Sequence, residues 1–175
     1  MLDYLVLYQS ETGNTQKLAA TIFSRLPGNS KDLIDITTDK TIPEAKIYFI
    51  GFCVHQGTCS MTVSDFLSSL SGKQIALFGP CGMGDSPEYY QAISCSVSAW
   101  IESDNQYLGS FLCQGRMPQQ VRKKYETLRT PENAEKMDFC IRNFDNALTH
   151  PDSLDFEHAK VFVDRILKLI GDGVF

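Results

Sequence analysis

The chain has 175 residues, enough for one domain with a substantial core, and its 43% hydrophobic share and mixed charges are typical of a globular protein. Its 16 Lys and Arg against 21 Asp and Glu give a net charge of −5, which argues against nucleic-acid binding because that function favours basic surfaces. No apolar run is long enough to span a bilayer and the chain starts directly on a strand-like segment, so we expect a cytoplasmic protein without membrane insertion.

The first predicted unit is a strand over residues 4–9 and an amphipathic helix that begins near residue 16. The turn between them reads Ser10-Glu11-Thr12-Gly13-Asn14-Thr15. A turn that opens a helix presents free backbone N–H groups and the positive end of the helix dipole, and Gly13 allows the backbone to turn sharply. Because the turn has hydroxyl and amide groups but no Lys or Arg, it suits a phosphate monoester held by neutral donors.

This turn has an alternative interpretation as an ordinary capped helix, since Ser, Thr and Asn are common caps. The turn matches neither the G-x-x-x-x-G-K-[ST] loop of nucleotide triphosphates nor the G-x-G-x-x-G fingerprint of dinucleotides. A single cap needs one polar residue, whereas this turn has four hydroxyl or amide side chains in six positions, so we favour the anion site.

The rest of the chain alternates between strands and helices. We predict further strands over residues 33–36, 47–54, 75–78 and 107–113. We predict further helices over residues 63–70, 88–102, 119–129, 134–148 and 155–170. The run 47–54 is apolar throughout, as in a central parallel strand, and the less hydrophobic 33–36 suits an edge. On the 88–102 helix, Ile93, Val97 and the pair Trp100–Ile101 are expected to face inward.

Six cysteines, at positions 53, 59, 81, 95, 113 and 140, show neither a C-x-x-C pair nor the spacing of metal ligands. Several lie in apolar runs, where Cys acts as a small buried hydrophobe. We therefore expect reduced thiols, no structural disulfide and no metal site, with a zinc site as the alternative that the spacing does not favour.

The alternation of strands and helices predicts an α/β fold, in which helices cover both faces of a parallel sheet. Ligands of such sheets bind beyond the carboxyl ends of the strands. The loops expected at that edge, residues 10–15, 55–60 and 79–88, are all rich in Gly, Ser, Thr or Asp. We expect one domain over residues 1–175, with residues 116–150 as a helical extension before the last helix.

With these loops placed, the sequence resembles the flavodoxin family. Residues 10–15 resemble its phosphate loop, [ST]-x-T-G-x-T, and Gly82-Met83-Gly84-Asp85-Ser86 resembles its G-x-G-D-S loop beside the flavin ring. The resemblance covers about residues 1–115 and implies a flavodoxin-like three-layer sandwich with sheet order 2-1-3-4-5 and extra C-terminal helices. Segments 51–58 and 109–117 resemble a bacterial subgroup, some of whose members resemble companions of a bilirubin reductase.

The resemblance implies an FMN site and no catalytic residue. The cofactor-binding residues that it implies are Ser10, Glu11, Thr12, Gly13, Asn14, Thr15, His55, Gln56, Gly57, Thr58, Gly82, Gly84, Asp85, Tyr89 and Tyr90. Flavodoxins usually stack the flavin between an aromatic residue after strand three and a Tyr after strand four. Here the first loop offers His55 and the second offers Tyr89 and Tyr90, which implies a different stacking arrangement.

The function that this resemblance implies is an FMN electron carrier that donates electrons to a partner reductase. One alternative is an FMN-dependent oxidoreductase acting directly on a quinone or tetrapyrrole, and turnover of small substrates without a partner would distinguish it. Another is a flavin-free binding scaffold. The basic run Arg122-Lys123-Lys124 with Arg129 is either a solvated helix face or a docking patch for an acidic partner or substrate carboxylates.

Overall fold

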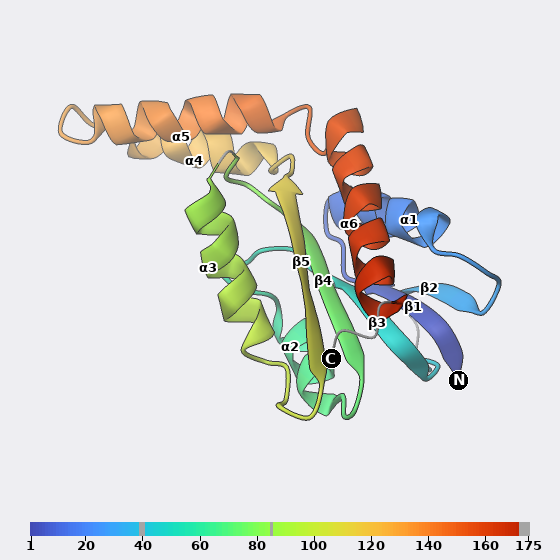
Figure 1. The fold of residues 1–175 in the computed structure, drawn as a ribbon. Coiled ribbons are helices and arrows are strands. Elements are labelled where there is room, and N and C mark those ends of the chain that lie inside the picture. Colours follow the sequence, from blue (N-terminus) through green and yellow to red (C-terminus); the bar gives the residue numbers. More distant parts are fainter. Residues whose placement is uncertain (39–40, 85, 172–175) are drawn as a thin grey trace.

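A computed structural model describes residues 1–38, 41–84 and 86–171, and Figure 1 shows its parallel sheet with helices on both faces. The strands are β1 (Leu2–Tyr8), β2 (Lys31–Asp35), β3 (Ala45–Gly51), β4 (Gln74–Cys81) and β5 (Gln106–Gln114). Their order, β2-β1-β3-β4-β5, confirms the predicted topology, with β2 at an edge and β3 in the centre. Val6 of β1 lies opposite Leu33 on one side and Phe49 on the other.

The helices are α1 (Asn14–Arg25), α2 (Met61–Ser69), α3 (Pro87–Ser98), α4 (Gln119–Leu128), α5 (Ala134–Ala147) and α6 (Ser153–Gly171). Helices α1 and α6 bury their apolar stripes on one face of the sheet, against alternate residues such as Val6 and Phe49. Helices α2 and α3 cover the other face, against the intervening residues such as Leu7 and Ile50. Because both faces are buried, the central strands are apolar at consecutive positions, such as residues 47–50 of β3, rather than at every second one.

Two predicted elements extended three or four residues too far. The third strand was predicted to reach residue 54 but ends at Gly51, although the Phe52 N–H still donates to the Phe78 carbonyl at 3.0 Å. Helix α3 was predicted to reach residue 102 but ends at Ser98, so Trp100 leaves the helical register. The prediction that Trp100 faces inward was therefore wrong, since 47% of its surface is exposed.

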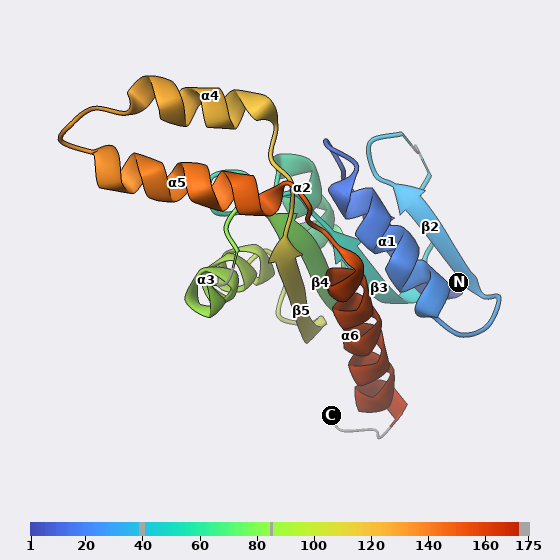
Figure 2. The same cartoon turned by 90° about the horizontal axis from the view of Figure 1, so that it is seen from above.

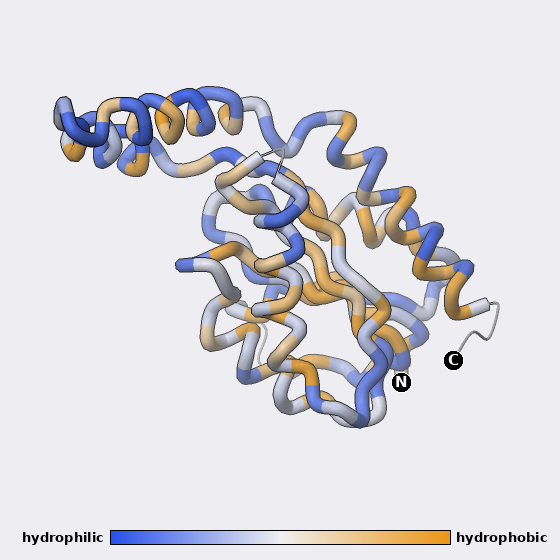
Figure 3. Tube along the Cα trace, turned by 60° about the vertical axis from the view of Figure 1, so that its left-hand side comes forward, coloured by the Kyte–Doolittle hydropathy of each residue, from blue (hydrophilic) through white to orange (hydrophobic). Residues whose placement is uncertain are grey.

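Helices α4 and α5 form an antiparallel hairpin that projects sideways from the edge of the sheet where β5 ends (Figures 1 and 2). Figure 3 shows hydrophobic and hydrophilic residues alternating along both helices of this hairpin, in contrast to the largely hydrophobic central strands. Met137 and Phe144 of α5 are buried, whereas α4 has no buried residue. The helices thus cover each other along one stripe and leave their other faces to solvent.

Among the residues described, no helix has both the length and the hydrophobicity needed to cross a membrane.

Candidate functional site

The turn between β1 and α1 leaves the start of α1 open. Gly13 precedes the helix with a φ of +82°, which favours glycine, and it provides no side-chain cap. Helices α2 and α3 are each capped by their own serine, because Ser60 Oγ accepts from the Val63 N–H and Ser86 Oγ accepts from the Tyr89 N–H. Of these three helices that follow strands, α1 is the one whose N–H groups are left to an external acceptor.

Two of the predicted phosphate ligands instead hold the turn in place. Asn14 is 4% exposed, and its side-chain amide donates to the Arg116 carbonyl at 2.9 Å. Thr15 is fully buried, and its Oγ1 lies 3.2 Å from Cys53 Sγ. These contacts fix the turn to the segments after β5 and β3. The groups that remain accessible are the backbone of the turn, the side chains of Glu11 and Thr12 and, in part, the Ser10 hydroxyl, whose oxygen accepts from the Gly13 N–H at 3.1 Å.

The turn forms one wall of a pocket of about 110 Å³, whose other walls follow β3, β4 and β5. Its lining residues are Glu11, Thr12, Asn14, Cys53, Val54, His55, Pro80, Cys81, Gly82, Gly115, Arg116, Met117 and Pro118. The structure therefore brings together five of the predicted site residues, from three loops that are distant in the sequence. It also adds residues that the sequence interpretation missed, above all Arg116 and Met117.

Arg116 supplies a positive charge that the turn itself lacks. Its side chain is exposed and forms no ion pair with any described residue, while its backbone is fixed by the Asn14 amide and by donation from its N–H to the His150 carbonyl. The neutral donors of the turn therefore have a cationic side chain beside them, which the sequence interpretation did not include. Arg116 lies 102 residues from Asn14 in the sequence, and no local pattern connects them.

The segment His55–Thr58 is a tight hairpin turn. The His55 and Thr58 backbones exchange hydrogen bonds, and Gln56 and Gly57 have φ values of +48° and +87°, as in a type I′ turn. His55 Nε2 lies 3.1 Å from Glu11 Oε1, so this turn contacts the Ser10–Thr15 turn directly. The Thr58 hydroxyl oxygen is buried and has no hydrogen-bond partner among the described residues. These two loops therefore form one continuous rim of the pocket.

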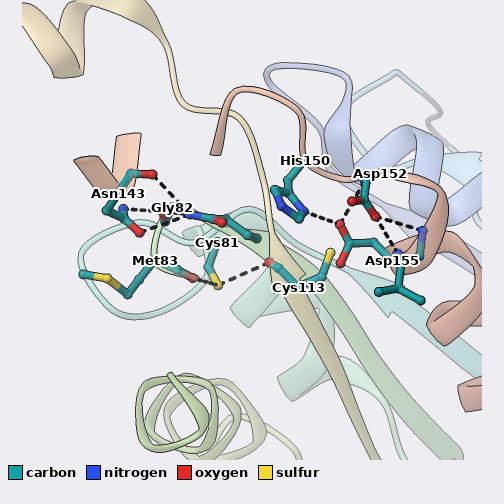
Figure 4. A network of polar contacts seen from close by, with 10 residues as sticks. Cys81, Gly82, Met83, Cys113, Asn143, His150, Asp152 and Asp155 are labelled. Atoms are coloured by element: carbon teal, nitrogen blue, oxygen red, sulfur yellow. Dashed lines mark hydrogen bonds and ion pairs between the residues drawn. The ribbon is translucent and has the colours of Figure 1, made fainter. Parts of the chain in front are cut away.

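The loop after β4 is held from above by α5 (Figure 4). The Asn143 amide nitrogen donates to the Gly82 carbonyl at 2.8 Å, and its oxygen accepts from the Gly84 N–H at 3.2 Å. Gln114, at the end of β5, donates to the same Asn143 oxygen at 3.1 Å and to Gly82 at 3.3 Å. Asn143 was not predicted as a site residue, because nothing in its helix pattern distinguishes it. Asp85 lies outside the described residues.

A second, larger hollow of about 1070 Å³ lies on the other side of this loop, between it and α5. It is lined by Met83, Gly84, Ser86, Tyr89, Gln114, Phe139, Arg142, Asn143, Asp145, Asn146, Thr149 and His150. Two predicted residues, Gly84 and Tyr89, therefore line this hollow and not the small pocket beside the Ser10–Thr15 turn. The Tyr90 ring lies beside that of Tyr89, with a centroid distance of 6.4 Å, and burial raises the pKa of Tyr89.

His150, Asp152 and Asp155 place potential metal ligands within 4.8 Å of one another (Figure 4). Their hydrogen bonds are those of a helix cap: Asp152 accepts from the Leu154 and Asp155 N–H groups, and Asp155 accepts from the Asp152 N–H. His150 Nδ1 lies 2.6 Å from the same Asp155 oxygen. The cluster therefore accounts for the start of α6.

Cys81 and Cys113 should react slowly with alkylating reagents. Both are buried, and burial raises the pKa of Cys81 to about 12, so little thiolate exists near neutral pH. Cys95 is exposed. With iodoacetamide at about pH 8 we expect Cys95 to be labelled at least about tenfold faster than Cys81. Peptide mass spectrometry measures both rates, and equal rates in the folded protein would contradict the burial of Cys81.

Three comparisons relate this chain to known proteins. The family model described as "Flavodoxin domain" matches residues 5–164. Two curated relatives are both called flavodoxin-like domain-containing protein BilS. The chain is 33% identical to the one from Clostridioides difficile, over 93% of this chain and 95% of the relative, and 28% identical to the one from Clostridium symbiosum, over 98% and 100%.

Two solved structures share the fold at low identity. Rubredoxin oxygen:oxidoreductase from Desulfovibrio gigas aligns with a TM-score of 0.51 and 15% identity, over 84% of this chain and 36% of that one. A putative flavoprotein from Bacteroides eggerthii aligns with a TM-score of 0.50 and 18% identity, over 72% of this chain and 97% of that one.

Proposed function

The chain belongs to the flavodoxin domain family, and from this premise we propose that it binds FMN and carries electrons to a partner reductase. The observation that carries the proposal is the open N-terminus of α1, which faces the pocket that three sheet-edge loops share. An open helix N-terminus favours a phosphate through its N–H groups and its dipole.

The phosphate fits the donors at this turn. The backbone N–H groups at the start of α1 and the hydroxyls of Ser10 and Thr12 would hold its oxygens. Arg116 at the pocket rim would add a counter-charge. Asn14 and Thr15 would act indirectly, because their buried side chains set the shape of the turn. Riboflavin, which lacks the phosphate, would therefore bind more weakly than FMN.

The flavin ring needs more room than the pocket offers in this arrangement. At about 110 Å³ it is smaller than the roughly 300 Å³ or more of ordinary ligand pockets. The Met117 sulfur lies over Gly82, so close that a Cβ on Gly82 would stand 2.5 Å from it. Because Met has three rotatable bonds, a change of its rotamer would widen the space between the His55–Thr58 turn and the Gly82 loop.

FMN supplies the redox chemistry when it is bound, and the chain supplies orientation and a local environment. Gly82 and Gly115 place backbone instead of side chains along the pocket wall. The Glu11–His55 pair closes the rim beside the turn. We infer an electron carrier because Glu11 and His55, the carboxylate and the imidazole along this rim, lie 3.1 Å from each other and are both partly exposed.

One observation favours the second candidate, an FMN-dependent oxidoreductase that acts on a quinone or tetrapyrrole. The hollow of about 1070 Å³ beside the Gly82–Ser86 loop has room for a small acceptor. Tyr89 and Phe139 line it from opposite sides and offer aromatic surface for a planar molecule. In this case the chain would reduce such an acceptor without a partner protein.

The proposed function is tested by titrating the purified, colourless protein with FMN, FAD and riboflavin while following flavin fluorescence. We expect one FMN per chain and at least about tenfold weaker binding of riboflavin, because phosphate contacts of this kind each contribute more than 1 kcal/mol. FMN-loaded protein should then show no NADH-dependent reduction of menadione. Steady turnover would support the oxidoreductase instead, and indifference to all three flavins would overturn the FMN site.

A further inference from the structure

We propose that the base of the α4–α5 hairpin is a docking surface for a redox partner whose contact face is acidic. The docking residues are Lys123 and Lys124 on α4. The inference rests on the proposed function, since it places the partner at the sheet edge where the cofactor would lie. It goes further by naming the surface and the charge of the partner that fits it.

The hairpin lies next to the candidate cofactor site. Pro118 lines the small pocket, and α4 begins at the next residue. With a rise of 1.5 Å per residue, Lys123 and Lys124 lie only about 8–9 Å along the chain axis from Pro118. Seen from above the strand ends (Figure 2), α4 and α5 both extend from this edge. A partner that contacts these lysines would therefore sit close to the cofactor.

The two lysines are exposed on α4. On α4, Val121 and Tyr125 are half-buried and mark the side that packs on α5, whereas Lys123 and Lys124 are exposed. The base of the hairpin is held to the Gly82 loop by Asn143, so it offers a positioned surface.

The charges of the chain are segregated. Residues 116–150 contain seven Lys or Arg against five Asp or Glu, a net charge of +2, while the remainder contains nine against sixteen, a net charge of −7. The hairpin therefore carries positive charge on an acidic protein. Such segregation orients an approaching partner and steers an acidic face toward the positive end.

The ion pairs within the hairpin sharpen this pattern. Arg122 pairs with Glu126 and Asp145, and Arg129 pairs with Asp138. These ion pairs involve three of the five Asp and Glu residues in the segment 116–150. The remaining acids, Glu132 and Glu135, lie at the far end of the hairpin, beyond α4 and at the start of α5.

The base of the hairpin is therefore left with unpaired positive charge. Lys123 and Lys124 form no ion pair with any described residue. The predicted patch of four basic residues thus reduces to two available lysines. An acidic protein surface is favoured over nucleic acid, because the remaining net charge of −7 would repel a polyanion that extends past the hairpin.

The test compares the wild type with K123E/K124E and with the control K160E/K168E, which makes the same charge change on α6. The first probe is fluorescein-labelled decaglutamate, titrated by anisotropy without flavin at an ionic strength of about 10 mM, where surface charges act over long distances. We expect K123E/K124E to bind at least about fivefold more weakly than the wild type and the control. Equal binding by all three proteins would overturn the docking surface.

The second probe follows oxidation of the reduced, FMN-loaded protein by ferricyanide and by tris(phenanthroline)cobalt(III). For the wild type, the ferricyanide rate should fall as salt rises, despite the net charge of −5, because the nearest charges are positive. K123E/K124E should invert this dependence for ferricyanide and speed up oxidation by the cobalt cation. A wild-type rate that rises with salt would contradict the proposal.

The two probes separate the possible failures. The peptide titration needs no FMN, so a protein that ignores flavins but loses decaglutamate binding in K123E/K124E would overturn the proposed function and retain the acidic docking surface. A protein that binds FMN but binds decaglutamate equally well as wild type and as K123E/K124E would retain the proposed function and overturn the docking surface. A ten-nucleotide DNA that binds more tightly than decaglutamate, with the same dependence on the lysines, would replace the protein partner by a nucleic acid.

Discussion

Thr12→Asp is expected to weaken FMN binding at least about 100-fold, which is close to 2.7 kcal/mol. Thr12 is exposed on the turn and lines the small pocket. A carboxylate about 5 Å from a phosphate dianion costs about 2–7 kcal/mol at effective dielectric constants between 80 and 20. The same carboxylate is favourable for the open N-terminus of α1, so the protein should remain folded.

Riboflavin provides the internal control for this substitution, since it lacks the phosphate that the new carboxylate would repel. Its dissociation constant should change by less than about threefold, because only the ring contacts remain. Thr21→Asp is the matched protein control, because Thr21 lies on the same helix and its hydroxyl donates only to the Lys17 carbonyl. Equal losses of FMN and riboflavin affinity in the Thr12 variant would place the phosphate elsewhere.

Asn143→Asp is expected to destabilise the protein by about 2–3 kcal/mol, because a half-buried donor is replaced by a charged acceptor that faces a carbonyl oxygen. The Asn143 nitrogen donates to Gly82 at 2.8 Å, and an Asp oxygen there would face the carbonyl instead. The hydrogen bonds from Gly84 and Gln114 to the other oxygen would survive. For a chain of this size the midpoint of thermal unfolding should fall by about 4–10 °C.

Asn146→Asp is the matched control, since Asn146 is exposed and lies one turn nearer the end of α5. Both substitutions place a new negative charge near a helix C-terminus, which is unfavourable by a few tenths of a kcal/mol up to about 1 kcal/mol. The difference between the two midpoints therefore isolates the contacts of Asn143. If the two variants melted together, the link between the hairpin and the Gly82 loop would carry no stability.

The sequence by itself determined the architecture, because its signals act over short distances. Apolar runs at β3 and β4 mark strands buried on both faces, and turns such as Pro27–Gly28 end the helix before β2. The position of the Ser10–Thr15 turn followed as well, since a strand and a helix that meet at five polar residues and a glycine must expose backbone donors there. These features need only neighbours along the chain.

Which residues surround that turn was decided by the tertiary structure. Arg116 reaches the pocket because β5 ends at the same edge as β1, and Asn143 reaches the Gly82 loop because α5 returns over β4. Contacts with the Arg116 carbonyl and with Cys53 Sγ hold Asn14 and Thr15 inward. Helix and strand periodicity indicates which face of an element is apolar, but it does not indicate which distant element packs on that face. For this reason the sequence predicted the Ser10–Thr15 turn and the basic helical extension, and only the fold showed that Arg116, the neighbouring hollow and the hairpin lie beside that turn.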